Sequence, residues 1–135
     1  MSRRFEKLKN DILGKSYFLS IACVDKKTST ELNKKYRKKN KPANILSFPL
    51  RQNMGEIILC ETIIKREAKK FGKTFDQFLG FLVIHGMLHL KGMEHSSTME
   101  VLEKRYDQKY FGGNRCRILH DKGGGWRISK GRKKS

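Results

Sequence analysis

The sequence predicts an α+β domain in which a small mixed sheet is flanked by helices. Short runs rich in β-branched and aromatic residues alternate with stretches in which apolar residues recur every three or four positions. The stretch 75–90 is apolar on nearly every side, so it is expected to form a helix in the centre of the domain. A chain of 135 residues is long enough for one such domain.

The first half of the chain is expected to contain two helices and three strands. Apolar residues at helical spacing predict a first helix that Gly14 ends: Phe5, Leu8 and Ile12. Strand composition predicts strands over 17–24, 44–48 and 55–60. Pro49 is expected to end the second strand, and Thr28 with Glu31 forms a capping-box pattern that opens a short helix. Tyr36 lies at helical spacing from the apolar residue of that helix and is expected in the core.

The second half is expected to be helical. Periodicity predicts helices over 61–71, over 75–90 and from residue 97 onward. Thr74 with Gln77 forms a capping box for the apolar helix, and Gly92 ends it. Ser97 with Glu100 is the corresponding pattern for the last helix.

The charge balance favours a polyanionic partner. Lys and Arg number 31 against 13 Asp and Glu, which gives a net charge of +18. This excess argues against an enzyme of acidic small molecules or a neutral structural protein, and it favours nucleic acid. The stretch 26–41 holds eight Lys and Arg against Glu31 alone, and we expect it to follow an RNA backbone.

Composition divides the chain into a domain over 1–110 and a basic, glycine-rich tail over 111–135. The tail is a solvated extension, an arm that contacts phosphates, or a short hairpin through Ile118 and Trp126, and the sequence leaves these alternatives open. Three widely spaced cysteines without a CxxC pair indicate reduced thiols and a cytoplasmic protein: Cys23, Cys60 and Cys116. Cys23 and Cys60 fall in predicted strands and are expected in the core. No apolar stretch is long enough to span a membrane.

Three histidines within eleven residues predict a metal site. His85 and His89 are four apart and therefore share one face of the predicted helix, and Gly92 allows the chain to return and bring His95 to the same point. Three imidazoles arranged in this way suit a tetrahedral Zn²⁺ ion with water in the fourth position. Nickel is also compatible with imidazole ligands.

Zinc metallopeptidases share the spacing of these histidines but carry a glutamate directly after the first one, as general base. That position is Gly86 here, which has no side chain to accept a proton. Glu94 is the nearby acid, and the sequence assigns it either to orienting a histidine or to acting as a base. A peptidase is therefore the weaker alternative.

The segment His85-Gly-Met-Leu-His-Leu-Lys-Gly-Met-Glu-His95 resembles the signature of the YbeY family of bacterial endoribonucleases. Leu32-Asn33, Tyr36-Arg37, the block Pro42-Ala-Asn-Ile-Leu-Ser-Phe-Pro49 and Gly55-Glu56-Ile57 resemble further family motifs, in the same order. Four positions depart from the family pattern, and the acidic ones keep their charge: Ala43, Glu56, Met93 and Glu94.

The resemblance implies an α+β fold, a three-histidine zinc site and a phosphodiester hydrolase that cleaves single-stranded RNA. It also implies maturation of the 3′ end of 16S rRNA, a part in ribosome quality control, and association with the rRNA precursor and the ribosome or its small subunit. Arg37 matches the arginine of a family motif, and its guanidinium suits the scissile phosphate, so Arg37 and His85 are the catalytic candidates. Asn44 and Ser47 match polar positions of the family and are candidates for binding substrate, or they satisfy buried backbone groups.

The main alternative is a ribosome-associated assembly factor that lacks catalysis and holds a structural zinc. Such a site needs a fourth protein ligand, and His120 is the remaining histidine. The sequence leaves open whether the nucleophile is a water at the metal or the 2′-hydroxyl of the RNA. It also leaves the oligomeric state open.

Overall fold

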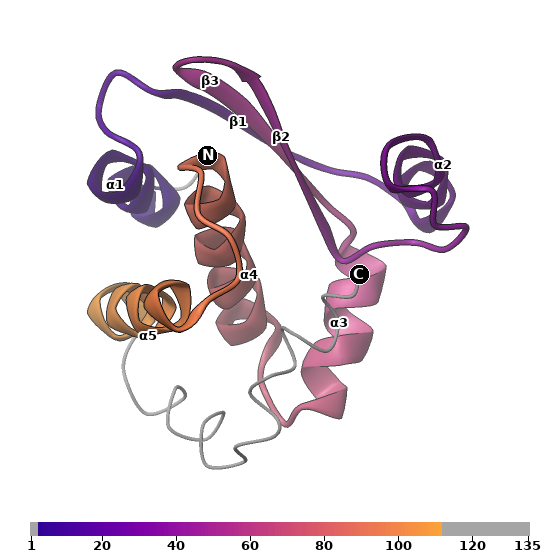
Figure 1. Cartoon of the computed structure of the whole chain (residues 1–135). Helices are drawn as coiled ribbons and strands as arrows, with labels where there is room; N and C mark the ends of the chain where they lie inside the picture. The colour runs from indigo at the N-terminus through magenta and orange to yellow at the C-terminus, as the bar shows by residue number, and fades with distance from the viewer. Residues whose placement is uncertain (1–2, 112–135) are drawn as a thin grey trace.

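The computed structural model describes residues 3–111, and over this range the chain forms five helices and three strands (Figure 1). The fold is α+β, as predicted. In chain order the elements are α1 (Arg3–Ile12), β1 (Phe18–Cys23), α2 (Lys26–Arg37), β2 (Ile45–Arg51), β3 (Met54–Leu59), α3 (Glu61–Lys70), α4 (Phe75–Leu90) and α5 (Ser97–Phe111).

The sheet is mixed and has the order β1-β3-β2. β1 runs parallel to β3, with Phe18 opposite Met54, and β2 runs antiparallel to β3, with Ile45 opposite Leu59. The short connection between β2 and β3 forms a hairpin, whereas α2 and β2 separate the two parallel strands in the sequence.

Helix α4 forms the centre of the molecule, as its composition predicts. Figure 1 shows α4 between the sheet and the pair α1 and α5. Val83, Ile84 and Met87 are fully buried and join one core with residues of α1, β3 and α5. None of the helices within residues 3–111 is long and apolar enough to cross a membrane.

Alternate residues of β3 face two different clusters. Ile57 points into the main core under α4, whereas Ile58 packs with Ala43 and Leu46 on the opposite face, where Leu32 of α2 covers them. The two faces of the sheet are therefore covered by different helices, and β2 carries polar Ser47 on the α4 side.

Pro49 does not end β2, which corrects the prediction. The strand continues to Arg51, with an irregularity in its register between Pro49 and Arg51. β2 pairs with β3 alone and is an edge strand, so the missing N–H of proline costs no ladder hydrogen bond there.

The predicted cap residues of α2 and α5 are wrong, although α5 begins at Ser97 as predicted. Asp25 caps α2, because its side chain accepts a hydrogen bond from the Thr28 N–H at 2.8 Å. In α5 the side chain of Ser96 accepts from the Met99 N–H at 3.1 Å, so the cap lies one residue before Ser97.

The capping box of α4 is confirmed. Thr74 accepts from the Gln77 N–H, and the Gln77 side chain accepts from the Thr74 N–H. Gly92 has φ +103°, which a glycine adopts without strain, and it turns the chain after α4 as predicted.

Two side chains expected in the core are exposed. Tyr36 is 54% exposed and packs against Phe48 of β2, with ring centroids 5.0 Å apart. Cys23, at the end of the edge strand β1, is exposed and lies 3.6 Å from a carboxylate oxygen of Glu61, whereas Cys60 is buried as predicted. Both residues lie near the end of their helix or strand. Periodicity identifies the face on which a side chain lies, but it does not show how far along that face the neighbouring element covers it.

The expected tail over 111–135 lies outside the described residues except for its first member. Phe111 is the last residue of α5 and is buried. A Cβ added at Gly80 would lie 2.9 Å from the ring of Phe111, so the glycine allows this ring to pack directly on α4. Cys116 and His120 also lie outside the described residues.

Candidate metal centre

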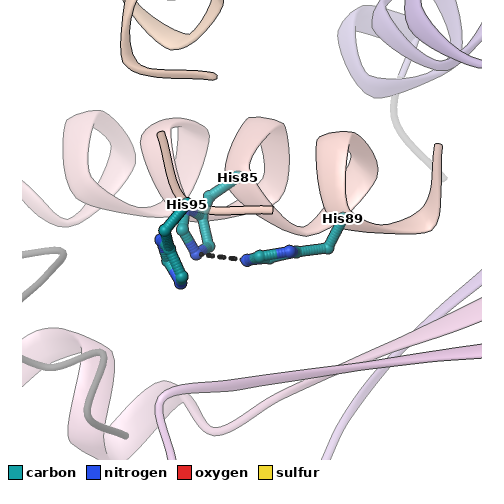
Figure 2. Close-up of side chains that lie close together, drawn as sticks. All are labelled: His85, His89 and His95. Atoms are coloured by element: carbon teal, nitrogen blue, oxygen red, sulfur yellow. Dashed lines mark hydrogen bonds between the residues drawn. The ribbon is translucent and has the colours of Figure 1, made fainter. Parts of the chain in front are cut away.

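The structure brings the three predicted histidines together (Figure 2). His85 and His89 lie one turn apart on α4, and His95 lies in the loop between α4 and α5. One candidate ligand atom from each residue can be chosen so that all three atoms lie within 4.8 Å of one another. No other group of three or more potential ligands of this kind occurs among residues 3–111.

The Nδ1 atoms of two histidines are engaged by oxygen atoms. His89 Nδ1 lies 3.0 Å from the carbonyl oxygen of Met93, and His85 Nδ1 lies 2.6 Å from Oε2 of Glu103. A carbonyl oxygen only accepts hydrogen bonds, so His89 Nδ1 carries the hydrogen, and an ionised carboxylate requires the same of His85. In the neutral rings the lone pairs are therefore on the Nε2 atoms.

The two Nε2 atoms face each other at 3.1 Å (Figure 2). Two lone pairs at this distance repel each other unless a cation lies between them. Nitrogen ligands about 2.0–2.1 Å from a tetrahedral zinc ion are about 3.3 Å apart, close to the observed separation. The nitrogen donors of His85, His89 and His95 therefore fit a zinc ion, and imidazole ligands also suit nickel.

Burial keeps His89 in the state that binds metal. Removal from water lowers the pKa of His89, and the neighbouring His85 lowers it further. The imidazole is therefore neutral at pH 7, as a metal ligand must be. His95 is exposed, whereas His85 and His89 are partly buried, so the cluster faces solvent on the side of His95.

Packing accounts for the glycine that follows the first histidine. A Cβ added at Gly86 would lie 2.9 Å from Ile45 Cδ1 and from Ser47 Oγ. Position 86 therefore faces the sheet, and a glutamate there would have to displace the side chains of Ile45 and Ser47. The metallopeptidase alternative lacks its general base for this structural reason as well as for the sequence reason.

Arg37 is the last residue of α2 and lies close enough to the cluster for its charge to lower the pKa of His89. It is partly buried, and the removal from water lowers the pKa of its guanidinium. The turn after it is held by fully buried Asn33, whose side chain donates to the Lys41 carbonyl at 2.8 Å. The positive φ of Lys38, 59°, directs the chain away from the helix at this point.

The two candidates for binding substrate have partners within the protein. Asn44 donates to Glu67 on α3 at 2.8 Å, so it connects the start of β2 with that helix. Ser47 makes a long contact of 3.4 Å with the Gly86 carbonyl oxygen, next to His85. Ser47 therefore lies beside the cluster, whereas Asn44 contributes to the packing of α3. A role for either in binding RNA stays a prediction.

Glu103 is the residue that sequence reasoning missed. Glu94, the acid considered for orienting a histidine, is exposed, and the carboxylate that contacts His85 belongs to α5. The sequence shows only that Met99, Glu103 and Asp107 recur every four residues, and the burial of this face of α5 is seen in the structure. An acidic residue on the buried face of a helix indicates a specific partner.

Comparison with known proteins places this chain in a family. The family model described as Endoribonuclease YbeY matches residues 2–110. The chain belongs to the YbeY family. The match covers every element from α1 to nearly the end of α5, and it includes Arg37 and the three histidines.

Curated YbeY relatives extend beyond the matched region. A protein named Endoribonuclease YbeY from Colwellia psychrerythraea is 40% identical over 97 residues, which cover 67% of this chain and 63% of the relative. A protein with the same name from Bdellovibrio bacteriovorus is 39% identical over 88 residues, which cover 63% of this chain and 59% of the relative. The chain thus matches about 60% of the length of these relatives.

A solved structure supports the same YbeY fold. The solution structure of TM1509 from Thermotoga maritima superposes with a TM-score of 0.61 at 30% identity. The superposition covers 84% of this chain and 83% of that one. The arrangement of the sheet around α4 is therefore shared with a structure determined independently.

Proposed function

We propose that this chain is a metal-dependent endoribonuclease that cleaves single-stranded RNA at the cluster of His85, His89 and His95. The observation that carries the proposal is the convergence of three imidazoles, on one solvent-facing side, in a chain of the YbeY family. Zinc is the metal that we assign, with nickel as the alternative that the same nitrogen ligands accept.

A bound zinc ion supplies a Lewis acid that polarises a phosphoryl oxygen and lowers the pKa of water. His85 and His89 would hold it through Nε2, because both Nδ1 atoms already have oxygen partners. Exposed His95 completes the set at the side from which RNA enters.

We assign Arg37 to the scissile phosphate. Its guanidinium offers two parallel N–H donors to the non-bridging oxygens and neutralises the charge that develops on them. Partial burial strengthens this interaction, because fewer water molecules compete for the same donors. Ser47, beside Gly86 on the α4 side of the sheet, is the polar group that we assign to substrate contact.

The nucleophile distinguishes two forms of this proposal. Attack by water leaves a linear phosphate, whereas attack by the 2′-hydroxyl of the RNA leaves a 2′,3′-cyclic phosphate on the upstream fragment. Analysis of the product ends therefore separates the two. In both forms Arg37 has the same partner, the phosphate.

For the cellular role we propose maturation of 16S rRNA at its 3′ end and ribosome quality control in the cytoplasm, with the rRNA precursor and the small subunit as partners. The net charge of +18 and the basic stretch 26–41 support a large RNA partner, and the family resemblance supports this particular one.

The decisive experiment compares wild type with His85→Ala on a labelled single-stranded rRNA fragment and on its duplex, with the metal content of both proteins measured. We expect one metal ion per wild-type chain, cleavage of the single strand, and loss of both in the variant. Equal cleavage by both proteins would indicate a contaminating nuclease.

A metal-loaded wild type that does not cleave would favour the assembly factor with a structural zinc. In that case His120→Ala should lower the zinc content, because a closed site needs a fourth protein ligand. For a catalytic site the same variant should keep its zinc.

A further inference from the structure

We propose that Glu103 is the positioning residue of the metal centre. Its carboxylate holds the Nδ1 hydrogen of His85 and thereby directs the Nε2 lone pair of His85 toward the metal. This inference rests on the proposed metal site and adds a residue of α5 to it. Glu103 touches the ligand and is not itself placed against RNA.

The contact is short and shielded from solvent. His85 Nδ1 and Glu103 Oε2 are 2.6 Å apart, and the two side chains are 13% and 3% exposed. A hydrogen bond with an ionised acceptor in such surroundings is stronger than one between neutral groups. The position of the His85 ring is therefore determined by a residue 18 positions later in the sequence.

The two histidines of α4 are oriented by different means. The Nδ1 partner of His89 is the backbone carbonyl of Met93, in the turn that directly follows α4. This hydrogen bond forms whenever α4 and the turn after it form. The Nδ1 partner of His85 is a side chain on another helix, so it forms only when α5 packs on α4.

The burial of Glu103 is difficult to explain by stability alone. The residue is 2% exposed, and its neighbours one turn back on the buried face include apolar Met99. A carboxylate removed from water is costly unless it is paired, and an apolar residue of similar volume often serves the fold as well. Its short contact with His85 explains the buried carboxylate, because the carboxylate orients a histidine of the proposed metal site.

The test measures metal affinity in Glu103→Gln, Glu103→Ala and the control Asp76→Asn. Asp76 is exposed in the first turn of α4, about 13 Å from His85 along the helix at 1.5 Å per residue, so its carboxylate should not matter. Zinc affinity is measured by competition with a chelator, and the ligand geometry is followed by the absorption spectrum of bound Co²⁺.

We expect Glu103→Ala to bind zinc 10–100-fold more weakly than wild type, as is typical when such an outer partner is removed. Glu103→Gln keeps an oxygen that accepts from Nδ1 of His85, so its loss of zinc affinity should be much smaller. Asp76→Asn should equal wild type. Equal affinity in wild type and a folded Glu103→Ala would overturn the inference while leaving the metal site intact.

A measurement on the wild type covers the case in which Glu103→Ala does not fold. Nitrogen-15 NMR of histidine-labelled protein reports which ring nitrogen carries the hydrogen. We expect hydrogen on Nδ1 of His85, and hydrogen confined to Nε2 would overturn the inference. A folded wild type without affinity for zinc, cobalt or nickel would overturn both this inference and the proposed function.

Discussion

Single atoms decide what the three-histidine cluster can bind. The Met93 carbonyl and the Glu103 carboxylate both accept hydrogen bonds, so each fixes a hydrogen on the Nδ1 of its histidine. The Nε2 atoms are left 3.1 Å apart with their lone pairs directed to a common point. The chemistry of the site thus follows from two oxygen atoms that are not ligands.

Arg37→Ala should lower the rate of RNA cleavage by about 10²–10³-fold, the usual effect of removing one donor that stabilises a transition state. Zinc content should not change, because Arg37 is not a ligand. Arg37→Lys keeps the charge but lacks the forked donors and should recover only part of the rate. The measurement is single-turnover cleavage of a labelled single strand.

Lys35→Ala is the matched control for Arg37. Lys35 is exposed two residues earlier on α2 and lies over the ring of Tyr36. At saturating concentrations, where a weaker contact with the RNA backbone does not limit the rate, its loss should change cleavage only slightly. Arg37→Ala with wild-type activity would remove Arg37 from the mechanism.

At the scale of elements, α2 combines a structural face with a basic one. Buried Ser29 and Asn33 attach it to the sheet side, through contacts with Ala43 and the Lys41 carbonyl. Its other face carries exposed lysines toward the end at which Arg37 lies. The helix therefore presents positive charge at the approach to the candidate metal centre.

Removing three of these charges should reduce both the affinity for single-stranded RNA and its dependence on salt. For a variant with glutamine at 34, 35 and 38, the slope of log K against log salt should fall by about 2, at roughly 0.7 per lost phosphate contact. The control has glutamine at three exposed lysines of α3, 65, 69 and 70, and loses the same charge elsewhere. Equal effects of the two triple variants would show that only total charge matters.

Helices α1 and α5 are connected by a polar contact at the surface. Asp11 accepts hydrogen bonds from Lys109 and from the hydroxyl of Tyr110, both at 2.7 Å. These two donors, Lys109 first, lower the pKa of Asp11 below its ordinary value of 3.8. The same contact raises the pKa of Lys109.

The sign of the pH dependence follows from this direction. Since the pKa of Asp11 is lower in the folded chain, its contribution to stability is present above about pH 3.8 and is lost as the pH falls through the folded value. Asp11→Ala should therefore be slightly less stable than wild type at pH 7, and the difference should shrink under acid conditions. Urea unfolding of both proteins at pH 7 and under acid conditions measures this difference in stability. A difference that does not change with pH would contradict the assignment.

At the scale of the whole molecule, the proposed metal connects parts that are distant in the sequence. Its ligands come from α4 and from the loop that follows, and Glu103 adds α5. Metal binding should therefore stabilise the packing of α5 on α4 as well as the loop. The pair α1 and α5 lies on the side of α4 away from the sheet (Figure 1).

Removal of the metal with a chelator should lower the melting temperature. At free zinc about 100 times the dissociation constant, binding stabilises the folded state by about 2.7 kcal/mol. His85→Ala should melt at the same temperature with and without zinc. A wild type whose melting temperature does not respond to zinc, cobalt or nickel would contradict the metal site.

The sequence alone determined the local features of this protein. The spacing of His85, His89 and His95 around Gly92, the apolar character of α4 and its capping box all follow from the periodicity of a helix and the conformational freedom of glycine. These properties depend on residues within a few positions of each other, so they can be recognised without knowledge of the rest of the fold.

Only the tertiary structure decided which distant residues meet. It placed Glu103 of α5 against His85, brought Arg37 near His89, left Tyr36 exposed and allowed Pro49 inside an edge strand. Each of these depends on how one element packs on another, and that packing is set by the shape of the whole core. A local pattern identifies the face of a helix or strand on which a side chain lies. Which other element packs on that face is decided by the fold.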